Sequence, residues 1–422
     1  MIDNTLITPD ERTYLRELAR EVLDCANLPI MEERKKLWYA HNAMKSEKPI
    51  VVMEEASFQE DMLPVLRCTS KAARGIERNL VVSLTNFRLV GDDKVISPYY
   101  PVFWHIAEPW YGVTTEREYA ADSAGRKIGF AQAHPIVSLD TDLAKLSHQP
   151  FHVDRDGTAA WRGVVEEAIG DILPVKLENS SLRWHTSPSQ RVVELMGLQN
   201  MMFAMVDEPD AMHELYRFIV EDMESFLRWQ ENEGLLVLNN GNHYAGAGSF
   251  GFTDELPTEQ CRLTGRITTK DLWGNMNSQE TVGISPAMFE EFILPSYMQL
   301  GENFGLTYFG CCEPVHAIWD TCISKLPHLR KVSISAWCDE EMMGQRLRNS
   351  GVIYSRKPSP NFIGVGEKLE EAVFRAHIAR TLTAARGCTL EIIFRDIYTV
   401  TGDRSKPGRA IQIVRELIES MW

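Results

Sequence analysis

The sequence predicts an α/β protein, a (β/α)8 barrel with an N-terminal helical extension. From residue 50 onward, short β-rich runs alternate with amphipathic helical segments, a pattern typical of parallel strands joined by helical crossovers. Polar or reactive residues follow nearly every run, as they do at the carboxyl ends of barrel strands. No glycine-rich fingerprint follows the first run, which disfavours the doubly wound open sheet.

Two regions are expected along the chain. Residues 1–48 form an N-terminal helical arm, since apolar residues recur at helical spacing between residues 10 and 45, with breaks at Pro29 and Pro49. Residues 49–422 form the barrel domain, and neither a repeat nor a linker divides them. The arm is expected to act as a lid or as a dimer arm, so a homodimer is considered.

The expected strands of the barrel are short runs of apolar residues. They are 50–54, 100–105, 181–185, 235–239, 306–309, 331–335, 352–355 and 390–394, with 271–276 as a ninth candidate. The helices carry clearer end signals. Pro209 opens a helix that ends at Gly234, Ser285 precedes a proline at a first helical position, Asp339 caps another helix, and Gly387 ends the helix 369–386.

Composition excludes several classes of function. With 44 basic and 59 acidic residues, the net charge of −15 offers no basic surface for nucleic acid or an anionic membrane. No stretch of about 18 apolar residues is free of charge, and the N-terminus lacks a signal-peptide pattern. The eight cysteines do not form a disulfide framework. We therefore expect a cytoplasmic protein with free thiols that acts on a small molecule.

Two adjacent thiols follow the strand LTYF directly, in the turn Gly310-Cys311-Cys312-Glu313-Pro314. Thiolates are soft ligands that favour zinc, and a catalytic zinc has three protein ligands and one open position. The alternative is a tightly packed turn, because a free cysteine is commonly a small buried apolar residue.

Charged residues follow two other strands. Arg395 and Asp396 follow LEIIF, and Arg356 and Lys357 follow VIYS. These charged side chains either contact the substrate or form a solvated rim around the site. Glu280 either points a carboxylate into the site or caps the helix that starts after Ser285. The predicted catalytic residues are Glu280, Arg395 and Asp396. Glu54 and Glu55 also end a strand, but neighbouring strand residues face opposite sides, so at most one enters the barrel.

The segment NNGNHYAGAGSFGF, residues 239–252, follows a predicted strand and is rich in glycine and asparagine. It either cradles a phosphate or carboxylate with backbone N–H groups or forms a mobile lid, and we favour the lid because no Gly-Lys-Ser/Thr is present. His243 is a candidate ligand or acid/base group. The predicted substrate-binding residues are Asn240, His243, Tyr308, Arg356 and Lys357.

Three stretches of the chain resemble the uroporphyrinogen decarboxylase superfamily, which includes cobalamin-dependent methyltransferases. They are LLVLNNGNHYAGAGSFGFTDELP, WGNMNSQETVGISPAMFEEFILPSYMQLGENFGLTYFGCCEPVH and EIIFRDIYTVTGDRSKPGRAIQIVREL. The resemblance implies a (β/α)8 barrel with a cleft at the strand carboxyl ends.

Departures from the family patterns favour one branch. True uroporphyrinogen decarboxylases carry Arg-Gln-Ala-Gly-Arg after the first strand, where this chain has Glu54-Glu55-Ala56-Ser57-Phe58. The methyltransferase branch binds zinc through a His-x-Cys turn and a later cysteine. Here the turn is Gly310-Cys311-Cys312, and Arg395-Asp396 stands where the later cysteine of that branch would be. The resemblance therefore implies a rebuilt zinc site, with Cys311, Cys312 and Glu280 as predicted ligands and Asp396 or His243 as alternatives.

The predicted function is zinc-dependent methyl transfer between a small methylated substrate and a separate corrinoid protein. The substrate is an aryl methyl ether, in an O-demethylation, or a methylamine-type compound. The corrinoid must belong to a partner, because the chain has no Asp-x-His-x-x-Gly motif. The first alternative is a metal-free decarboxylase or lyase that binds carboxylate through Arg356, Lys357 and Arg395, with Asp396 transferring protons. The second is a barrel without catalysis that acts as a binding protein.

Overall fold

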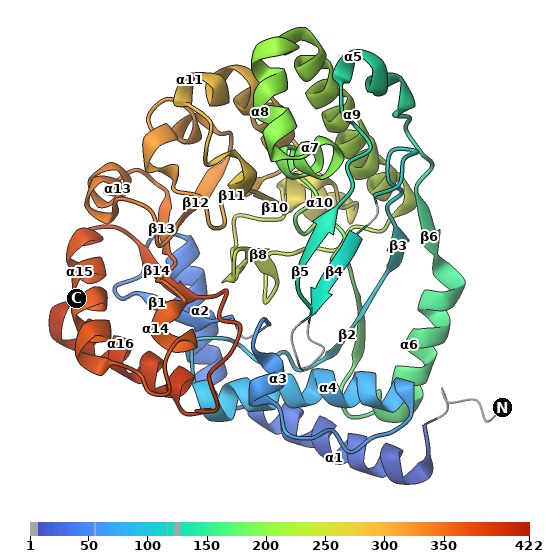
Figure 1. Ribbon diagram of the computed structural model, residues 1–422. Helices are drawn as coiled ribbons and strands as arrows, with labels where there is room; N and C mark the ends of the chain where they lie inside the picture. The colour runs from blue at the N-terminus through green and yellow to red at the C-terminus, as the bar shows by residue number, and fades with distance from the viewer. Residues whose placement is uncertain (1–6, 55, 116, 122–126) are drawn as a thin grey trace.

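Six parallel strands form the main sheet of the computed structural model, which describes residues 7–54, 56–115, 117–121 and 127–422. In spatial order they are β1 (Ile50–Met53), β14 (Leu390–Phe394), β13 (Ile353–Arg356), β12 (Leu329–Ile334), β11 (Leu306–Phe309) and β10 (Trp273–Met276). Nearly all of their residues are buried, as expected for a parallel sheet covered by helices. The α/β class is confirmed, and the carboxyl ends of all six strands lie along one edge (Figure 1).

The remaining strands form pairs. β2 (Tyr100–Phe103) and β7 (Val175–Glu178) are parallel. Three pairs are antiparallel: β3 (His105–Ala107) with β6 (His152–Asp154), β4 (Arg117–Ala121) with β5 (Lys127–Gln132), and β8 (Tyr244–Gly246) with β9 (Ser249–Phe250). The strands predicted at 181–185 and 235–239 were wrong: the first forms turns, and the second joins no ladder. In the described residues the parallel ladders form two separate sheets rather than a closed ring.

Side chains end the main sheet at both edges. At β1, the amides of Val51 and Met53 donate to the carboxylates of Asp93 and Asp92, both at 2.8 Å. At β10, the side chain of Asn239 accepts from the amide of Trp273 and donates to its carbonyl. These bonds satisfy the backbone groups that a further strand would otherwise pair. The ladder therefore stops at β1 and at β10.

Helices surround the sheets on their outer faces (Figure 1). They are α1 (Pro9–Ala26), α2 (Pro29–Asn42), α3 (Gln59–Met62), α4 (Lys71–Thr85), α5 (Leu139–Asp142), α6 (Arg155–Ile169), α7 (Pro188–Met196), α8 (Leu198–Asp207), α9 (Pro209–Glu233), α10 (Glu259–Thr264), α11 (Pro286–Met288), α12 (Leu294–Gly301), α13 (Glu340–Leu347), α14 (Asn361–Gly364), α15 (Glu371–Ala384) and α16 (Lys406–Met421). Predicted caps are confirmed, since Ser285 accepts from the amide of Met288, Asp339 accepts from that of Met342, and Gly234 ends α9 in the left-handed conformation.

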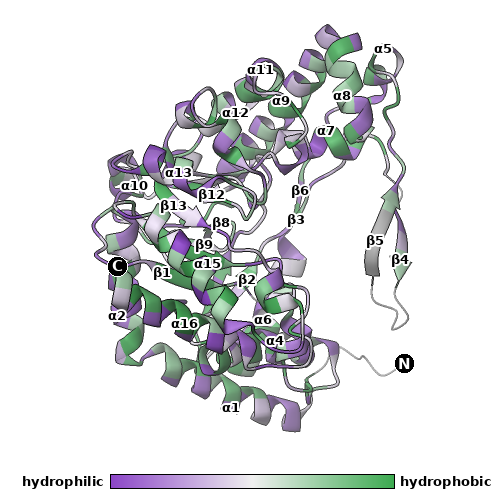
Figure 2. Cartoon of the chain, turned by 60° about the vertical axis from the view of Figure 1, so that its left-hand side comes forward, coloured by the Kyte–Doolittle hydropathy of each residue, from purple (hydrophilic) through white to green (hydrophobic). Residues whose placement is uncertain are grey.

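The N-terminal arm packs against its own chain. α1 lies beside α4 in both views (Figures 1 and 2). In α2, Trp38 is fully buried and its indole N–H donates to the carbonyl of Asp93, while Asn42 donates to the carbonyls of Phe250 and Phe252. His41 of α2 lies 3.2 Å from Glu391, near the amino end of β14. The arm thus covers the amino ends of the strands. A lid over the site would have to lie at the other end, over the carboxyl ends of the strands.

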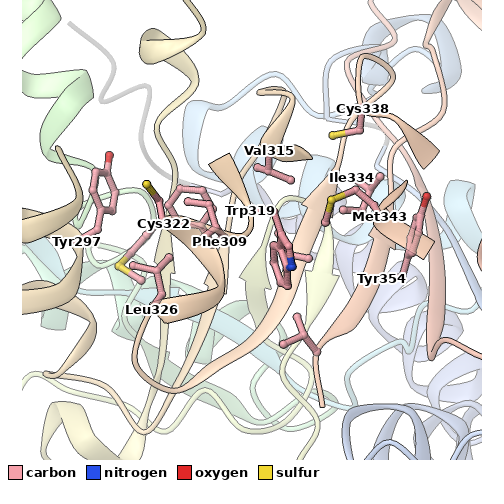
Figure 3. Packing of buried hydrophobic residues seen from close by; sticks show 14 of the residues in the cluster. Tyr297, Phe309, Val315, Trp319, Cys322, Leu326, Ile334, Cys338, Met343 and Tyr354 are labelled. Carbon is pink, nitrogen blue, oxygen red and sulfur yellow. The ribbon is translucent and has the colours of Figure 1, made fainter. Parts of the chain in front are cut away.

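A cluster of buried apolar residues packs the sheet against several of its covering helices. Figure 3 shows part of it, where Phe309 and Ile334 of the sheet lie near Trp319, Cys322 and Met343. None of the described helices is long and apolar enough to cross a membrane.

Candidate functional site

A cavity of about 590 Å³ lies at the carboxyl ends of β10 to β14. Residues that directly follow five strands line it, as the fold rule for parallel α/β sheets predicts. The lining residues are Trp184, Gln190, Asn277, Gln279, Cys311, Cys312, Ser335, Ala336, Trp337, Lys357, Pro358, Pro360, Arg395, Asp396 and Tyr398. We refer to this space as the main cavity. It brings together five of the predicted site residues: Cys311, Cys312, Lys357, Arg395 and Asp396.

The two thiols point to the same side of the turn after β11. Gly310 makes the turn at φ +99°, and a Cβ there would lie 3.0 Å from Cβ of Ser333. The Sγ atoms of Cys311 and Cys312 are 3.4 Å apart, and Cys312 donates to Asp396 Oδ2 at 3.2 Å. The bond to Cys311, burial and the Asp396 carboxylate raise the pKa of Cys312 above its ordinary value. At neutral pH Cys312 is therefore a thiol that donates a hydrogen bond, not a thiolate.

Glu313 holds this turn in place. Its buried carboxylate accepts from the amide of Cys311 at 2.7 Å and from the amide of Ser278 at 2.8 Å. Because one carboxylate bonds to both loops, the loop after β10 and the turn after β11 are fixed to each other.

A guanidinium and a carboxylate face each other at the end of β14. Arg395 Nε lies 3.2 Å from Glu54 and 3.4 Å from Asp396, and its guanidinium lies over the ring of Trp184. Asp396 and Trp184 have φ values of +59° and +62°, a backbone conformation that costs residues other than glycine about 1–3 kcal/mol. Both residues line the main cavity.

Lys357 is a buried lysine whose amine is held in place by hydroxyl groups. Its Nζ donates to Ser355 Oγ at 2.5 Å and to the hydroxyl of Tyr308 at 2.9 Å. Burial lowers the pKa of Lys357 from 10.5 to about 7, although Glu391 acts in the opposite direction. Both forms of the amine are then present at neutral pH, as suits a group that donates or accepts a proton.

A buried polar network continues from Lys357 toward the amino ends of the strands. Ser355 donates to Glu391 Oε1 at 2.5 Å, and Lys331 Nζ lies 3.2 Å from the same carboxylate. His41 reaches it from α2. Burial raises the pKa of Glu391, but Lys331 and His41 more than offset this, so the pKa lies below its ordinary value. Glu391 is therefore an anion that pairs with Lys331 inside the sheet, whereas burial lowers the pKa of His41 and leaves its imidazole neutral at pH 7.

The glycine-rich segment is buried inside the protein, and the predicted lid is wrong. Residues 245–249 are all buried, and Ser249 donates to Glu391 and accepts from Lys331. A Cβ on Gly248 would lie 2.6 Å from Ile393 Cγ2. The glycines permit close packing of β8 and β9 against the sheet (Figure 1).

A second cavity of about 480 Å³ lies between this hairpin and the β2–β7 pair. His243 lines it and bonds to Glu178 at 3.1 Å. Glu54 lines it too, and its ion-pair partner Arg395 lines the main cavity.

The other predicted site residues lie outside both cavities. Glu280 accepts from Ser189 at 3.2 Å. Arg356 donates to the carbonyls of its neighbouring strand and pairs with Glu340. Asn240 donates to the carbonyls of Thr253 and Leu256. Tyr308 positions Lys357. Glu55 lies outside the described residues.

Several cavity residues were missed in the sequence. Trp184 and Gln190 come from a turn and from α7, and Trp337 and Tyr398 lie beyond the strands on exposed loops. Asn277 follows the strand candidate 271–276, so its position after a strand was the available signal.

The thiols as arranged do not fit the predicted zinc site. The part of the chain that the structure describes contains no group of three or more His, Cys, Asp or Glu side chains arranged to hold a metal ion. Glu280, the predicted third ligand, is bound to Ser189 instead.

Comparison with solved structures finds a likeness to a methyltransferase from Methanosarcina mazei. The two chains share 12% identity at a TM-score of 0.47, over 92% of this chain and 98% of the other. No family model matches the sequence, and no curated protein does.

Proposed function

We propose that this protein is a methyltransferase that moves a methyl group from a small methylated substrate to a corrinoid held by a separate protein, with the reaction in the main cavity. One observation carries the proposal: Lys357, with a pKa of about 7, lines the same cavity as the Cys312–Asp396 pair and Arg395. The sequence resemblance to the cobalamin-dependent methyltransferases supplies the reaction class.

The cavity is suited to an aryl methyl ether. The rings of Trp184, Trp337 and Tyr398 line it and offer flat apolar surfaces to an aromatic ring. Trp337 and Tyr398 are 75% and 78% exposed, so they form an aromatic rim on the outside of the cavity. The partner's corrinoid would approach the methyl group across this rim.

Lys357 supplies the proton that demethylation of an ether requires. As the bond between oxygen and the methyl carbon breaks, its electron pair stays on the oxygen, which takes a proton from Lys357 Nζ. The methyl group would pass, without that electron pair, to a reduced cobalt(I) corrinoid of the partner, which would supply the electrons of the new bond. Ser355 and Tyr308 hold the amine in position, and Arg395 and Asp396 orient the substrate beside it. General acid catalysis of this kind contributes about 10²–10⁴-fold in rate.

The test is an anaerobic assay with free cob(I)alamin as methyl acceptor and a panel of methoxylated aromatic compounds and methylamines. Wild type should consume cob(I)alamin with at least one substrate, and Lys357→Met should lose about 10²-fold or more of that rate. Lys325→Met is the matched control, because Lys325 is half-exposed and pairs with Glu290. Equal rates for all three proteins would contradict the role of Lys357.

The same preparation tests the other predictions. Release of carbon dioxide from carboxylated substrates without a corrinoid would support the metal-free decarboxylase in place of the methyltransferase. Elemental analysis of wild type and Cys312→Ala decides the zinc prediction: about one zinc per chain that is lost in the variant would require the thiols to rearrange around a metal.

A further inference from the structure

The paired thiols of Cys311 and Cys312 have a geometry that points to a ligand other than zinc. Zinc–sulfur bonds of roughly 2.3 Å at a tetrahedral angle place two sulfurs roughly 3.8 Å apart. Here the Sγ atoms are 3.4 Å apart. A pyramidal centre, whose bond angles are smaller than tetrahedral, fits the shorter separation better.

We propose that Cys311 and Cys312 form a chelating site for trivalent arsenic, which both thiols bind within the main cavity. Trivalent arsenic is thiophilic and pyramidal, and it prefers two thiols that are held together to two separate ones. Both residues line the cavity, and Cys312 is only partly buried, so a small arsenical can reach them. The site does not depend on the proposed methyl transfer.

Binding exchanges two hydroxide groups of the arsenical for the two thiols. An organic arsenical such as phenylarsine oxide exists in water as a dihydroxide. Two As–O bonds break, two As–S bonds form, and each hydroxide leaves as water with one thiol proton. Arsenic stays trivalent, so no oxidant or reductant is needed. Asp396 accepts the hydrogen bond of the Cys312 thiol and is placed to receive its proton on the way to water.

Among the described residues, no other two cysteines have a thiol–thiol contact of this kind. Cys25 is the other thiol that is not fully buried, and Cys68, Cys261, Cys322, Cys338 and Cys388 are buried. The chain therefore provides a matched control in Cys25, which has comparable exposure and no neighbouring thiol contact.

The experiment is native mass spectrometry of the full-length protein after incubation with an equimolar amount of phenylarsine oxide. Wild type and Cys25→Ser should each carry one phenylarsenic adduct, which dithiothreitol removes. Cys311→Ser and Cys312→Ser should each weaken binding by about 10²-fold or more, since the second bond is no longer intramolecular. Far-UV circular dichroism shows whether the variants are folded.

The proposal would be overturned if wild type took up no arsenical, or if the adduct persisted in folded Cys312→Ser. Peptide mapping adds an independent readout that does not require a variant. The adduct on wild type should protect Cys311 and Cys312 from iodoacetamide and leave Cys25 reactive. Protection of other cysteines instead would place the arsenical elsewhere and would also contradict the proposal.

Discussion

Lys357 illustrates how the surroundings of one side chain determine its chemistry. A lysine on the surface is a permanent cation at neutral pH, with an ordinary pKa near 10.4. Lys357 is buried, its amine bonds to Ser355 and Tyr308, and its pKa falls to about 7. A residue that the sequence predicts as a substrate contact thereby becomes a candidate proton donor.

The rate of methyl transfer from an ether should therefore fall as the pH rises through about 7, because the donating ammonium form is lost above the pKa of Lys357. Lys357→Arg keeps the positive charge but cannot release the proton, since the guanidinium pKa exceeds 12. This variant should lose about 10²-fold in rate and also lose the step near pH 7. Initial rates of cob(I)alamin consumption over a pH series measure both. If the rate of Lys357→Arg still fell near pH 7, the pH dependence would come from the titration of another group.

The pKa of Cys312 depends on the neighbouring thiol of Cys311. The bond to Cys311 is the largest cause of its raised pKa. Cys311→Ala should therefore lower that pKa and speed the alkylation of Cys312 by iodoacetamide at a fixed pH, because the thiolate is the reactive form. Peptide mapping over time follows the reaction, and Cys25 in the same chain is the internal reference. A slower or unchanged reaction at Cys312 would show that another neighbour controls its pKa.

Among the secondary-structure elements, the buried hairpin β8–β9 differs most from the mobile lid that the sequence predicts for this segment. A run rich in glycine and asparagine predicts a backbone with conformational freedom, but it does not tell where that backbone lies. Here the small residues let the hairpin approach the sheet, while Ser249 satisfies the buried charges of Lys331 and Glu391. These contacts are long-range, so the local pattern could not reveal them.

Gly248→Ala should consequently destabilise the protein more than Gly234→Ala. Both glycines have a positive φ, which costs an alanine roughly 1–2 kcal/mol. At Gly234 a Cβ meets nothing within 4 Å, whereas at Gly248 it clashes with Ile393. Overpacking adds about 1–3 kcal/mol there. Urea unfolding gives both free energies, and equal values would argue against close packing of the hairpin.

The buried carboxylate of Glu391 should contribute to the unfolding free energy of the protein. Glu391→Gln removes the anion between Lys331 and His41 and should cost about 3–5 kcal/mol of unfolding free energy at pH 7. The folded-state pKa of Glu391 is lowered, so its contribution is complete above the unfolded pKa of about 4.3 and is lost as the pH falls. Glu302→Gln, at an exposed pair, should cost less than about 1 kcal/mol. Denaturant titration of both variants at pH 7 and at acid pH gives their unfolding free energies. Similar losses of unfolding free energy in the two variants would contradict a buried charge at Glu391.

At the scale of the whole molecule, the sequence predicts the main sheet well because its strands are short runs of buried, largely apolar residues. The run 390–394 is an example, and the reactive residues that follow it, Arg395 and Asp396, line the main cavity. The run 235–239 has the same local pattern, but Asn239 bonds to Trp273 through its side chain and no ladder forms. β7 was missed because its residues Val175–Glu178 are half charged.

Methyl transfer in the main cavity is tested by following a deuterated methyl group from substrate to acceptor. A trideuteromethoxy aromatic substrate is incubated anaerobically with the protein and cob(I)alamin, and the cobalamin is then analysed by mass spectrometry. We expect labelled methylcobalamin with wild type and Lys325→Met, and at least about 10²-fold less with Lys357→Met. Label that stays on every substrate tested with folded wild type, or equal transfer by Lys357→Met, would contradict this expectation.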